Sequence, residues 1–497
     1  MVHIVWSLGS QLGYFDMSVV GIAFGIYLIL ILFVGFYASK QTKNLKDFAL
    51  GGHRLGPWVI AFSERASGES AWLILGLPGA ALVAGLFEVW TVIGCIMGII
   101  FSWMMIAKPL RIMTGKYNVI TLPELFHKKF KDEKGTIRLL SGYIITFFFV
   151  FYVAAQFSGA GKVLNVTFGL SQFEGMILGA VIIIFYTLIG GFLAVAWTDL
   201  IQGIIMISTL VILPIVGIIQ LNTIPDQPLF QWDTLYGGKT GIPAIIGMIG
   251  GLSWGFGYMG QPHLVTRFMA IDSSDNIQKS RRIAISWALP AFFGAMIIGL
   301  VGNGLLQSGI LIHEGEKIFS SHQLPDPEKI MPIMATSLLP AWLAGIFISG
   351  AIAAMMSTAD SQLLVSTSVI TEDLLAPNVA TYGGLTKLTW SRIFTLLIGL
   401  IAFIMAWRTK DLVFEMVSYA WSGLGASFGP ALLLTLWWNR VRREGVIAGL
   451  LVGSISTIIW ANINGLSILV TERIISFILA FLSVVIVSIY FEKKNGD

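Results

Sequence analysis

Three ionisable side chains lie within six residues of one another in an apolar run that is long enough to cross a membrane. The run extends from residue 57 to about residue 86, and Glu64, Arg65 and Glu69 fall in its middle. Each of these groups would cost roughly 2.5 to 3.5 kcal/mol at the centre of a lipid-facing helix. We therefore expect them to face protein, water or a ligand, and we interpret the run as a binding site.

The residues between and beside these charges are small. They are Ala66, Ser67, Gly68, Ser70 and Ala71. Because little side-chain bulk covers the backbone here, a local unwinding could turn carbonyls and amides toward a bound ion or solute. Transporters build binding pockets near the membrane midplane in this way.

A second apolar span also departs from helix propensity. Between Gly250 and His263 there are five glycines and Pro262. Neighbouring groups must satisfy the backbone that such residues free, so the pattern predicts a broken or kinked span. Glycine also serves tight helix packing in membranes, and this alternative stays open for the segment taken alone.

A third span carries hydroxyl groups on one face. Ala354, Ser357, Thr358 and Ser361 are spaced i, i+3, i+4 and i+7, so they share a narrow face of a helix. A hard cation such as sodium needs several oxygen ligands and little steric bulk. Two of these hydroxyls, with carbonyls from an unwound segment around residues 66–69, would make such a site. Packing of helix against helix is the alternative use of the pattern.

Composition places these segments in an integral membrane protein. Of 497 residues 56% are hydrophobic and only 12% are charged, against about 25% in soluble domains. The single cysteine, Cys95, excludes an intramolecular disulfide. We find no nucleophile with a partner base and no phosphate loop, so we predict neither an enzyme nor transport driven by nucleotide hydrolysis. We expect one membrane domain over residues 1–497.

The apolar runs predict an all-α protein with about thirteen transmembrane helices. Their ranges are about 18–38, 57–84, 87–107, 139–163, 173–195, 198–219, 243–262, 284–307, 336–366, 391–407, 411–437, 446–463 and 473–491. Most of the 31 lysine and arginine residues then fall on one side, Arg267 among them, which puts the C-terminus in the cytoplasm and the N-terminus outside. The two irregular spans are the second and the seventh, as expected for two five-helix units of opposite topology.

Collinear stretches along nearly the whole chain resemble the sodium/solute symporter family, and within it most closely the sodium/proline symporters. The stretches are residues 50–57, 70–80, 190–199, 254–263, 356–358, 370–374 and 417–421. The resemblance implies a leucine-transporter-type inverted five-plus-five repeat. It would comprise an extra N-terminal helix at about 18–38, a first repeat at about 57–219, a second at about 243–437, and extra C-terminal helices at about 446–491.

The resemblance also implies a function and a site. The protein would be a plasma-membrane symporter that uses the sodium gradient to import a small solute, most closely proline or a related amino acid, by alternating access. Sodium would bind the backbone carbonyls of Ala66, Glu69 and Ala354 and the hydroxyls of Ser357 and Thr358. Contacts with the solute would come from the region of Gly68, Trp72, Tyr152, Trp254, Tyr258 and Pro262.

The chain departs from the family pattern at Gly68, where the proline symporters have an aspartate tied to sodium coupling. Glu69 or Asp360 could take over that carboxylate role. Alternatively, the Arg65 cation could replace the ion and give a proton-coupled or uncoupled carrier, or Arg65 could form a structural bridge with Glu69 or Asp360. A membrane sensor that has lost transport is a further alternative.

Two other acids are candidates for a part in coupling. Glu64 adjoins Arg65, and Asp199 follows Trp197 and Thr198 at a predicted junction between two helices. We expect Asp199 to cap the second of these helices, with a second ion path as the alternative. We expect Lys162, near the outer end of its span, to extend its ammonium group to the membrane surface.

Overall fold

The computed structural model describes residues 17–40, 50–53, 55–225, 227–313, 316–318, 324–375, 381–382, 385–463, 465–466 and 470–494. The described chain is an all-α bundle with two short antiparallel hairpins in its loops, β1 (Ile312–His313) with β2 (Glu316–Lys317) and β3 (Thr381–Tyr382) with β4 (Leu385–Thr386). The N-terminal residues 1–16, part of the orientation prediction, lie outside the described residues.

The helices follow one another along the chain in two groups. Up to residue 221 they are α2 (Met17–Ser39), η1 (Gly51–His53), α4 (Pro57–Gly68), η2 (Trp72–Gly76), α5 (Leu77–Ala84), η3 (Gly85–Glu88), α6 (Val89–Phe101), η4 (Ser102–Ile106), α7 (Ala107–Tyr117), α8 (Leu122–Lys129), α9 (Thr136–Phe168), α10 (Gln172–Gly190) and α11 (Phe192–Leu221). After it they are η5 (Trp232–Tyr236), α12 (Gly241–Leu252), α13 (Trp254–Gly257), α14 (Pro262–Ala270), η6 (Ser274–Asn276), α15 (Ile277–Gln307), η8 (Pro327–Lys329), α16 (Ile330–Leu338), α17 (Ala341–Val369), η9 (Ile370–Leu375), α18 (Lys387–Arg408), α19 (Val413–Trp437), α20 (Arg443–Asn462) and α22 (Glu472–Lys494).

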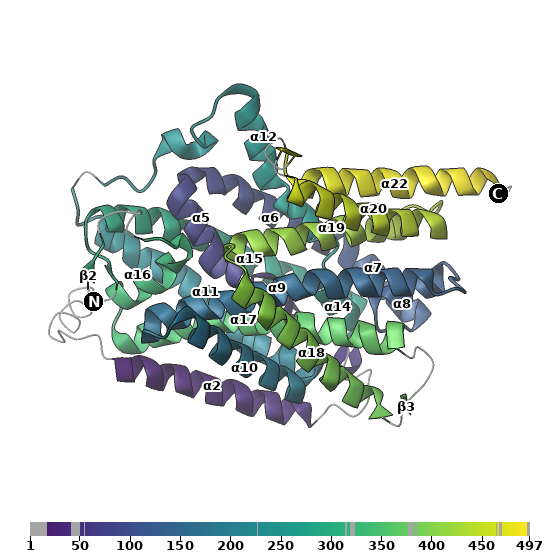
Figure 1. Cartoon of the computed structure of the whole chain (residues 1–497), viewed down its shortest axis with the longest axis horizontal. Helices are drawn as coiled ribbons and strands as arrows, with labels where there is room; N and C mark the ends of the chain where they lie inside the picture. Colours follow the sequence, from purple (N-terminus) through teal and green to yellow (C-terminus); the bar gives the residue numbers. More distant parts are fainter. Residues whose placement is uncertain are drawn as a thin grey trace.

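Most of the long helices run along the long axis of the molecule, with α2 at one edge and α20 and α22 at the opposite edge (Figure 1). Among the described residues, nine helices are long and apolar enough to cross a membrane, and one bent pair adds a tenth candidate. Every predicted span overlaps a helix. The number thirteen stays a prediction, because α10 and α19 are not among the nine and one apolar helix runs from Trp72 to Tyr117.

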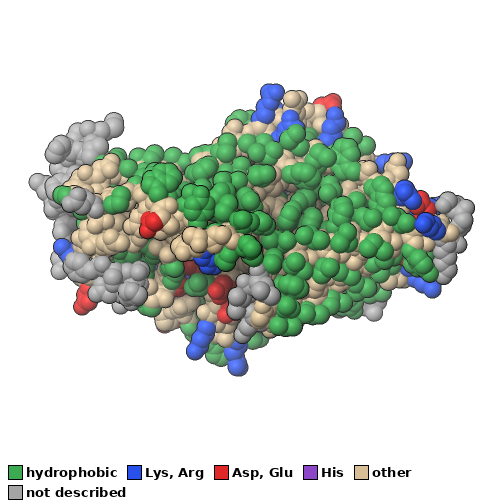
Figure 2. Space-filling view, turned by 90° about the horizontal axis from the view of Figure 1, so that it is seen from above, with side chains coloured by type: hydrophobic (Ala, Val, Ile, Leu, Met, Phe, Trp, Pro, Cys, Tyr) green, Lys and Arg blue, Asp and Glu red, His purple; other side chains and the backbone are tan. Residues whose placement is uncertain are grey.

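The exterior of the bundle suits a hydrocarbon environment. On α2, Ile22, Ile26, Ile29 and Phe33 are each 62 to 69% exposed. Hydrophobic side chains cover most of the visible face, while lysine and arginine side chains gather toward its margins (Figure 2). The molecule therefore presents an apolar surface to lipid and encloses its buried charges within the bundle.

Both predicted irregular spans are interrupted. α4 ends at Gly68, Glu69 and Ser70 are not helical, and a helix resumes at Ala71. In the second span, α12–α13 and α14 are bent by 42° around residues 258–261. The freed amide of Ala71 donates a hydrogen bond to the Gln156 Oε1 atom of α9 (3.0 Å), so a polar side chain of a neighbouring helix stabilises the first break.

One predicted junction was wrong. The chain turns at Gly191, with φ 71° and ψ 176°, and α11 begins at Phe192 rather than near residue 198. Glycine adopts such a positive φ without the steric penalty that a side chain incurs. Asp199 consequently lies inside α11, in its second turn, and does not cap a helix.

Candidate functional site

The end of α4 lies against the hydroxyl-bearing face of α17. Ser357 Oγ donates to the carbonyl oxygen of Ala66 (2.8 Å) and lies 3.2 Å from the carbonyl of Ala354. Thr358 Oγ1 donates to the carbonyl of Ser67 (3.0 Å). Two hydroxyls and several carbonyls from elements 291 residues apart thus converge beside the break in α4. This is the oxygen-rich, sterically small environment that a hard cation requires.

The charges of α4 form a cluster on another side of the same helix end. Arg65 pairs with Glu64, and its Nη1 donates to Glu69 Oε1 (2.6 Å). Tyr258 donates its hydroxyl to the Glu69 carboxylate (3.2 Å), and the Trp103 indole donates to Glu64 Oε2 (3.0 Å). The predicted pairing of Arg65 with Glu69 is present, whereas Asp360 belongs to another cluster. All these side chains are buried, so their hydrogen bonds replace water.

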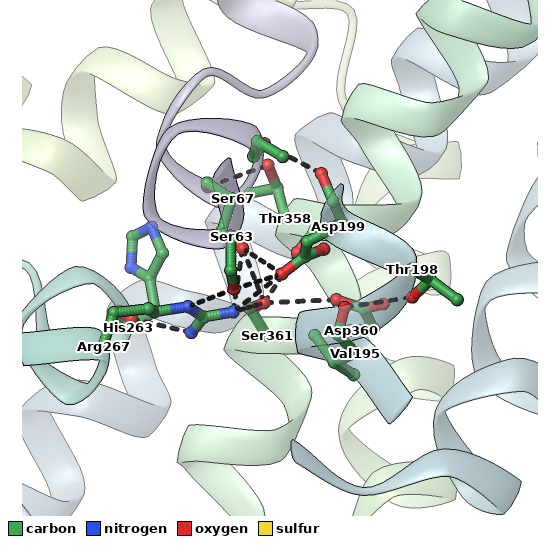
Figure 3. A network of polar contacts seen from close by, with 12 residues as sticks. Ser63, Ser67, Val195, Thr198, Asp199, His263, Arg267, Thr358, Asp360 and Ser361 are labelled. Atoms are coloured by element: carbon green, nitrogen blue, oxygen red, sulfur yellow. Dashed lines mark hydrogen bonds and ion pairs between the residues drawn. The ribbon is translucent and has the colours of Figure 1, made fainter. Parts of the chain in front are cut away.

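A second charged network joins α4, α11, α14 and α17 (Figure 3). Asp199 Oδ2 accepts from Ser63 Oγ (2.6 Å) and Ser67 Oγ (3.2 Å) and lies 3.4 Å from Arg267 Nη2. The same Arg267 nitrogen donates to Ser67 Oγ (2.8 Å) and to Ser361 Oγ. The four helices are therefore connected through one buried arginine.

The position of Arg267 corrects the sequence-based prediction. We counted it with the lysines and arginines of loops on the C-terminal side, but α14 continues to Ala270 and the side chain is fully buried. A count of charges assigns a residue to a loop wherever an apolar run ends. It cannot recognise a cation that is retained inside the protein by a buried carboxylate.

Asp360 lies next to this network on α17. Its Oδ1 atom accepts a hydrogen bond from Ser361 Oγ (3.2 Å). Its Oδ2 atom and the Oδ1 atom of Asp199 are buried and have no hydrogen-bond partner among the described residues. The network thus holds two carboxylates and one guanidinium, as the cluster of Glu64, Arg65 and Glu69 does.

Aromatic rings gather next to the break in α4. Trp72 and Trp254 stack with ring centroids 4.7 Å apart, so the two interrupted spans meet face to face. Trp421 of α19 contacts Tyr258 edge-on at 4.7 Å and lies 6.4 Å from Tyr152. Trp421 also lies 6.4 Å from Trp254. The four predicted aromatic solute contacts, Trp72, Trp254, Tyr258 and Tyr152, therefore belong to one continuous group of neighbouring rings.

The other two predicted solute positions lie on the α14 side. Pro262 begins α14 and lines a small space with Leu122, Ile145 and Leu364. Gly68 faces α14, because a Cβ atom there would lie 3.2 Å from Leu264 Cδ2.

Lys162 does not extend to the surface as we predicted. Its side chain is 4% exposed and its Nζ lies 2.9 Å from Asp326 Oδ2 and 2.5 Å from Glu328 Oε2. The Glu328 carboxylate also accepts the backbone amides of Val413 (2.9 Å) and Phe414 (2.8 Å) at the start of α19. An acidic partner 166 residues away in the chain keeps the lysine inside.

Sequence reasoning missed Gln156, Arg267, Phe414 and Trp421. The interruption of an apolar helix by a glutamine is a signal that could have identified Gln156, since a buried amide needs a partner. Phe414 and Trp421 carry no such signal. They look like ordinary apolar residues until the fold places them against Trp254, at 5.0 Å and 6.4 Å between ring centroids.

An all-helical membrane protein in which two interrupted spans enclose buried charges, hydroxyls and aromatic rings has the architecture of a secondary transporter. A model of the family described as "Sodium:solute symporter family" matches residues 48–453. The chain belongs to this family. It is accordingly a multi-pass, sodium-coupled membrane transporter and not an enzyme.

Curated relatives match over nearly their whole length. The chain is 36% identical over 477 residues to the sodium/proline symporter of Escherichia coli (strain K12), which covers 94% of this chain and 92% of the relative. It is 38% identical over 472 residues to the high-affinity proline transporter PutP of Bacillus subtilis (strain 168), covering 92% and 95%.

Solved structures confirm the fold class. A Na+-coupled sialic acid symporter, described in a substrate-bound outward-open state with a novel Na+-site, matches with a TM-score of 0.72 at 20% identity, over 95% of this chain and 98% of that one. A nucleobase-cation-symport-1 family transporter, described in a closed conformation with bromovinylhydantoin bound, matches with a TM-score of 0.54 at 13% identity, over 90% and 95%. The predicted leucine-transporter-type fold is therefore correct.

Proposed function

We propose that this chain imports proline together with sodium by alternating access. The observation that carries the proposal is the convergence of the broken end of α4 with the hydroxyls of α17, next to stacked Trp72 and Trp254. The names of relatives at 36 to 38% identity support proline as the solute. One sodium ion entering across 100 mV gains about 2.3 kcal/mol, enough for about 50-fold accumulation of a neutral solute.

Sodium would bind between α4 and α17. The Ser357 and Thr358 hydroxyls, which now donate to carbonyls of α4, would rotate their hydrogens away and offer oxygen lone pairs to the ion. The carbonyls of Ala66, Glu69 and Ala354 would complete the set. Because this site lies between the break that follows α4 and helix α17 in the second half of the chain, an ion there would hold these two elements in a fixed relative position.

Proline would bind between the two interrupted spans. Trp72 and Trp254, with Tyr152 and Tyr258 nearby, offer flat apolar walls that suit a ring. Backbone amides at the break that follows Gly68 would hold the carboxylate. Since the two indole rings are in contact at 4.7 Å, a solute between them requires the rings to separate, and this would link solute binding to movement of α12–α13.

Glu69 is the best-placed replacement for the aspartate that the proline symporters have at the position of Gly68. A Cβ atom at Gly68 would lie 3.8 Å from Arg65 Nη2, so a carboxylate there would adjoin that guanidinium. Glu69, one residue further, places its carboxylate 2.6 Å from Arg65 Nη1. Asp360 lies in the network of Asp199 and Arg267 instead.

The remaining architecture follows the same proposal. Residues 57–219 and 243–437 would be the two inverted repeats of one domain, with thirteen spans, the N-terminus outside and the C-terminus in the cytoplasm. The bias of lysine and arginine residues supports this orientation even with Arg267 removed from the count.

Uptake of radiolabelled proline into proteoliposomes, with and without a sodium gradient, tests the function. We expect accumulation only with the gradient in the wild type and in Glu64→Gln, and loss of sodium dependence in Glu69→Gln. Glu64→Gln is the matched control because Glu64 contacts the same arginine. Equal uptake with and without sodium in the wild type would refute coupling, and equal behaviour of the two variants would refute the role of Glu69.

A further inference from the structure

A groove of about 500 Å³ opens where α7, α8 and α19 meet. α7 contributes Lys108, Ile112 and Lys116, which are spaced four residues apart and so lie on one face of the helix. Lys129 at the end of α8 and Trp437 at the end of α19 complete this part of the lining. The groove therefore combines three cations with apolar side chains.

The walls of the groove are fixed by hydrogen bonds to the backbone. The Trp437 indole nitrogen donates to the carbonyl of Met105 (2.7 Å), and Lys129 Nζ donates to the carbonyl of Thr435 (2.5 Å). Trp437, Ile112 and Met104 are each about 55% exposed. The hydrogen bond thus holds Trp437 in place, and the apolar side chains of the groove remain accessible from outside the protein.

The positive charge of the groove is not balanced by any carboxylate of the described residues. Within the described part of the chain, Lys108, Lys116 and Lys129 have no carboxylate within ion-pair distance, whereas the adjacent Lys128 pairs with Glu124 at 2.9 Å. Burial, together with the nearby Lys116 cation, lowers the pKa of Lys129. An anion among these lysines would relieve their mutual repulsion.

We propose that this groove is a binding site for an anionic phospholipid such as phosphatidylglycerol. Its phosphate would lie among Lys108, Lys116 and Lys129, and an acyl chain would follow Met104, Ile112 and Trp437. A lipid fits better than a soluble anion because α7 continues directly from the apolar helix that starts at Trp72, so the lysines lie at the end of a candidate membrane span. Basic pockets and tryptophan residues at this depth match headgroup and interface chemistry.

Native mass spectrometry of the purified full-length protein, titrated with phosphatidylglycerol or with phosphatidylcholine of the same acyl chains, tests the site. Each lysine near a phosphate accounts for about fivefold in affinity, so Lys108→Gln combined with Lys116→Gln should weaken phosphatidylglycerol binding about 25-fold. Lys128→Gln is the matched control, because it removes a neighbouring lysine that already has a carboxylate partner. We expect it to bind as the wild type does.

Three results would overturn the proposal. Equal phosphatidylglycerol binding by the double variant and the wild type would place the lipid elsewhere. Equal binding of phosphatidylcholine would remove the role of charge. Binding of sn-glycerol 3-phosphate as tight as that of the lipid would assign the groove to a soluble phosphate. A thermal unfolding curve of the double variant that matches the wild type in lipid-free detergent shows that a loss of binding is not a loss of fold.

Discussion

Removal of a single hydroxyl from α17 should separate an effect on sodium binding from an effect on protein stability. Ser357 and Ser349 lie on the same helix and are both buried. Among the described residues, Ser349 Oγ donates only to the carbonyl of Gly345 within the helix (2.8 Å), whereas Ser357 Oγ also reaches the carbonyl of Ala66 on α4 (2.8 Å). Ser349→Ala is therefore the control for Ser357→Ala, and only the second variant removes a proposed sodium ligand.

The magnitudes follow from the two contacts. Each variant loses one neutral hydrogen bond, worth about 0.5–1.5 kcal/mol of stability. Ser357→Ala also loses an oxygen that would contact a cation, and a polar contact with a charged group is worth about 1.5–3 kcal/mol. The half-saturating sodium concentration for proline uptake should therefore rise about 10- to 150-fold in Ser357→Ala and remain unchanged in Ser349→Ala.

The assay measures the initial rate of proline uptake into proteoliposomes at graded sodium concentrations, with choline as the replacing cation. Thermal unfolding of both variants, with sodium and with choline, reports stability and ion binding separately. An unchanged sodium dependence in Ser357→Ala, or an equal rise in both variants, would refute the placement of sodium between α4 and α17.

Three further predictions concern the surrounding groups. Arg65→Gln leaves two buried carboxylates without their cation and should lower the free energy of unfolding by about 3–5 kcal/mol, measured by denaturation in detergent. Glu64→Gln leaves Arg65 paired with Glu69 and should lower the free energy of unfolding by less. Equal losses in the two variants would contradict the role of Arg65 as the shared cation of the cluster. Trp254→Leu should raise the half-saturating proline concentration about 2- to 12-fold by removing an aromatic contact, with the sodium dependence unchanged; a change in sodium dependence alone would contradict the proposed solute site. Asp199→Asn should destabilise the protein by about 3–5 kcal/mol because Arg267 loses its carboxylate, and a stability equal to that of the wild type would show that the network does not support the fold.

The interruptions of the two spans could be predicted because they are local. Charged and small residues around Gly68 and the glycines before Pro262 conflict with an uninterrupted lipid-facing helix wherever the span is placed. The facing hydroxyls of Ser357 and Thr358 follow from helical spacing alone. Such features need no knowledge of which helices are neighbours.

The charged networks could not be predicted because they depend on tertiary contacts. Asp199 meets Ser63 across 136 residues and Arg267 meets Ser63 across 204 residues, and no local pattern specifies these pairs. The turn at Gly191 was accessible in principle, since two consecutive glycines precede Phe192. We placed the junction at the polar residues instead, and this error made Asp199 look like a cap.

The most direct test is to measure labelled sodium and labelled proline entering the same proteoliposomes under an imposed inside-negative potential. We predict that the two enter in a fixed ratio and that omission of either one abolishes entry of the other. In Ser357→Ala the same ratio should be reached only at raised sodium concentrations. Proline entry that continues without accompanying sodium would contradict the account.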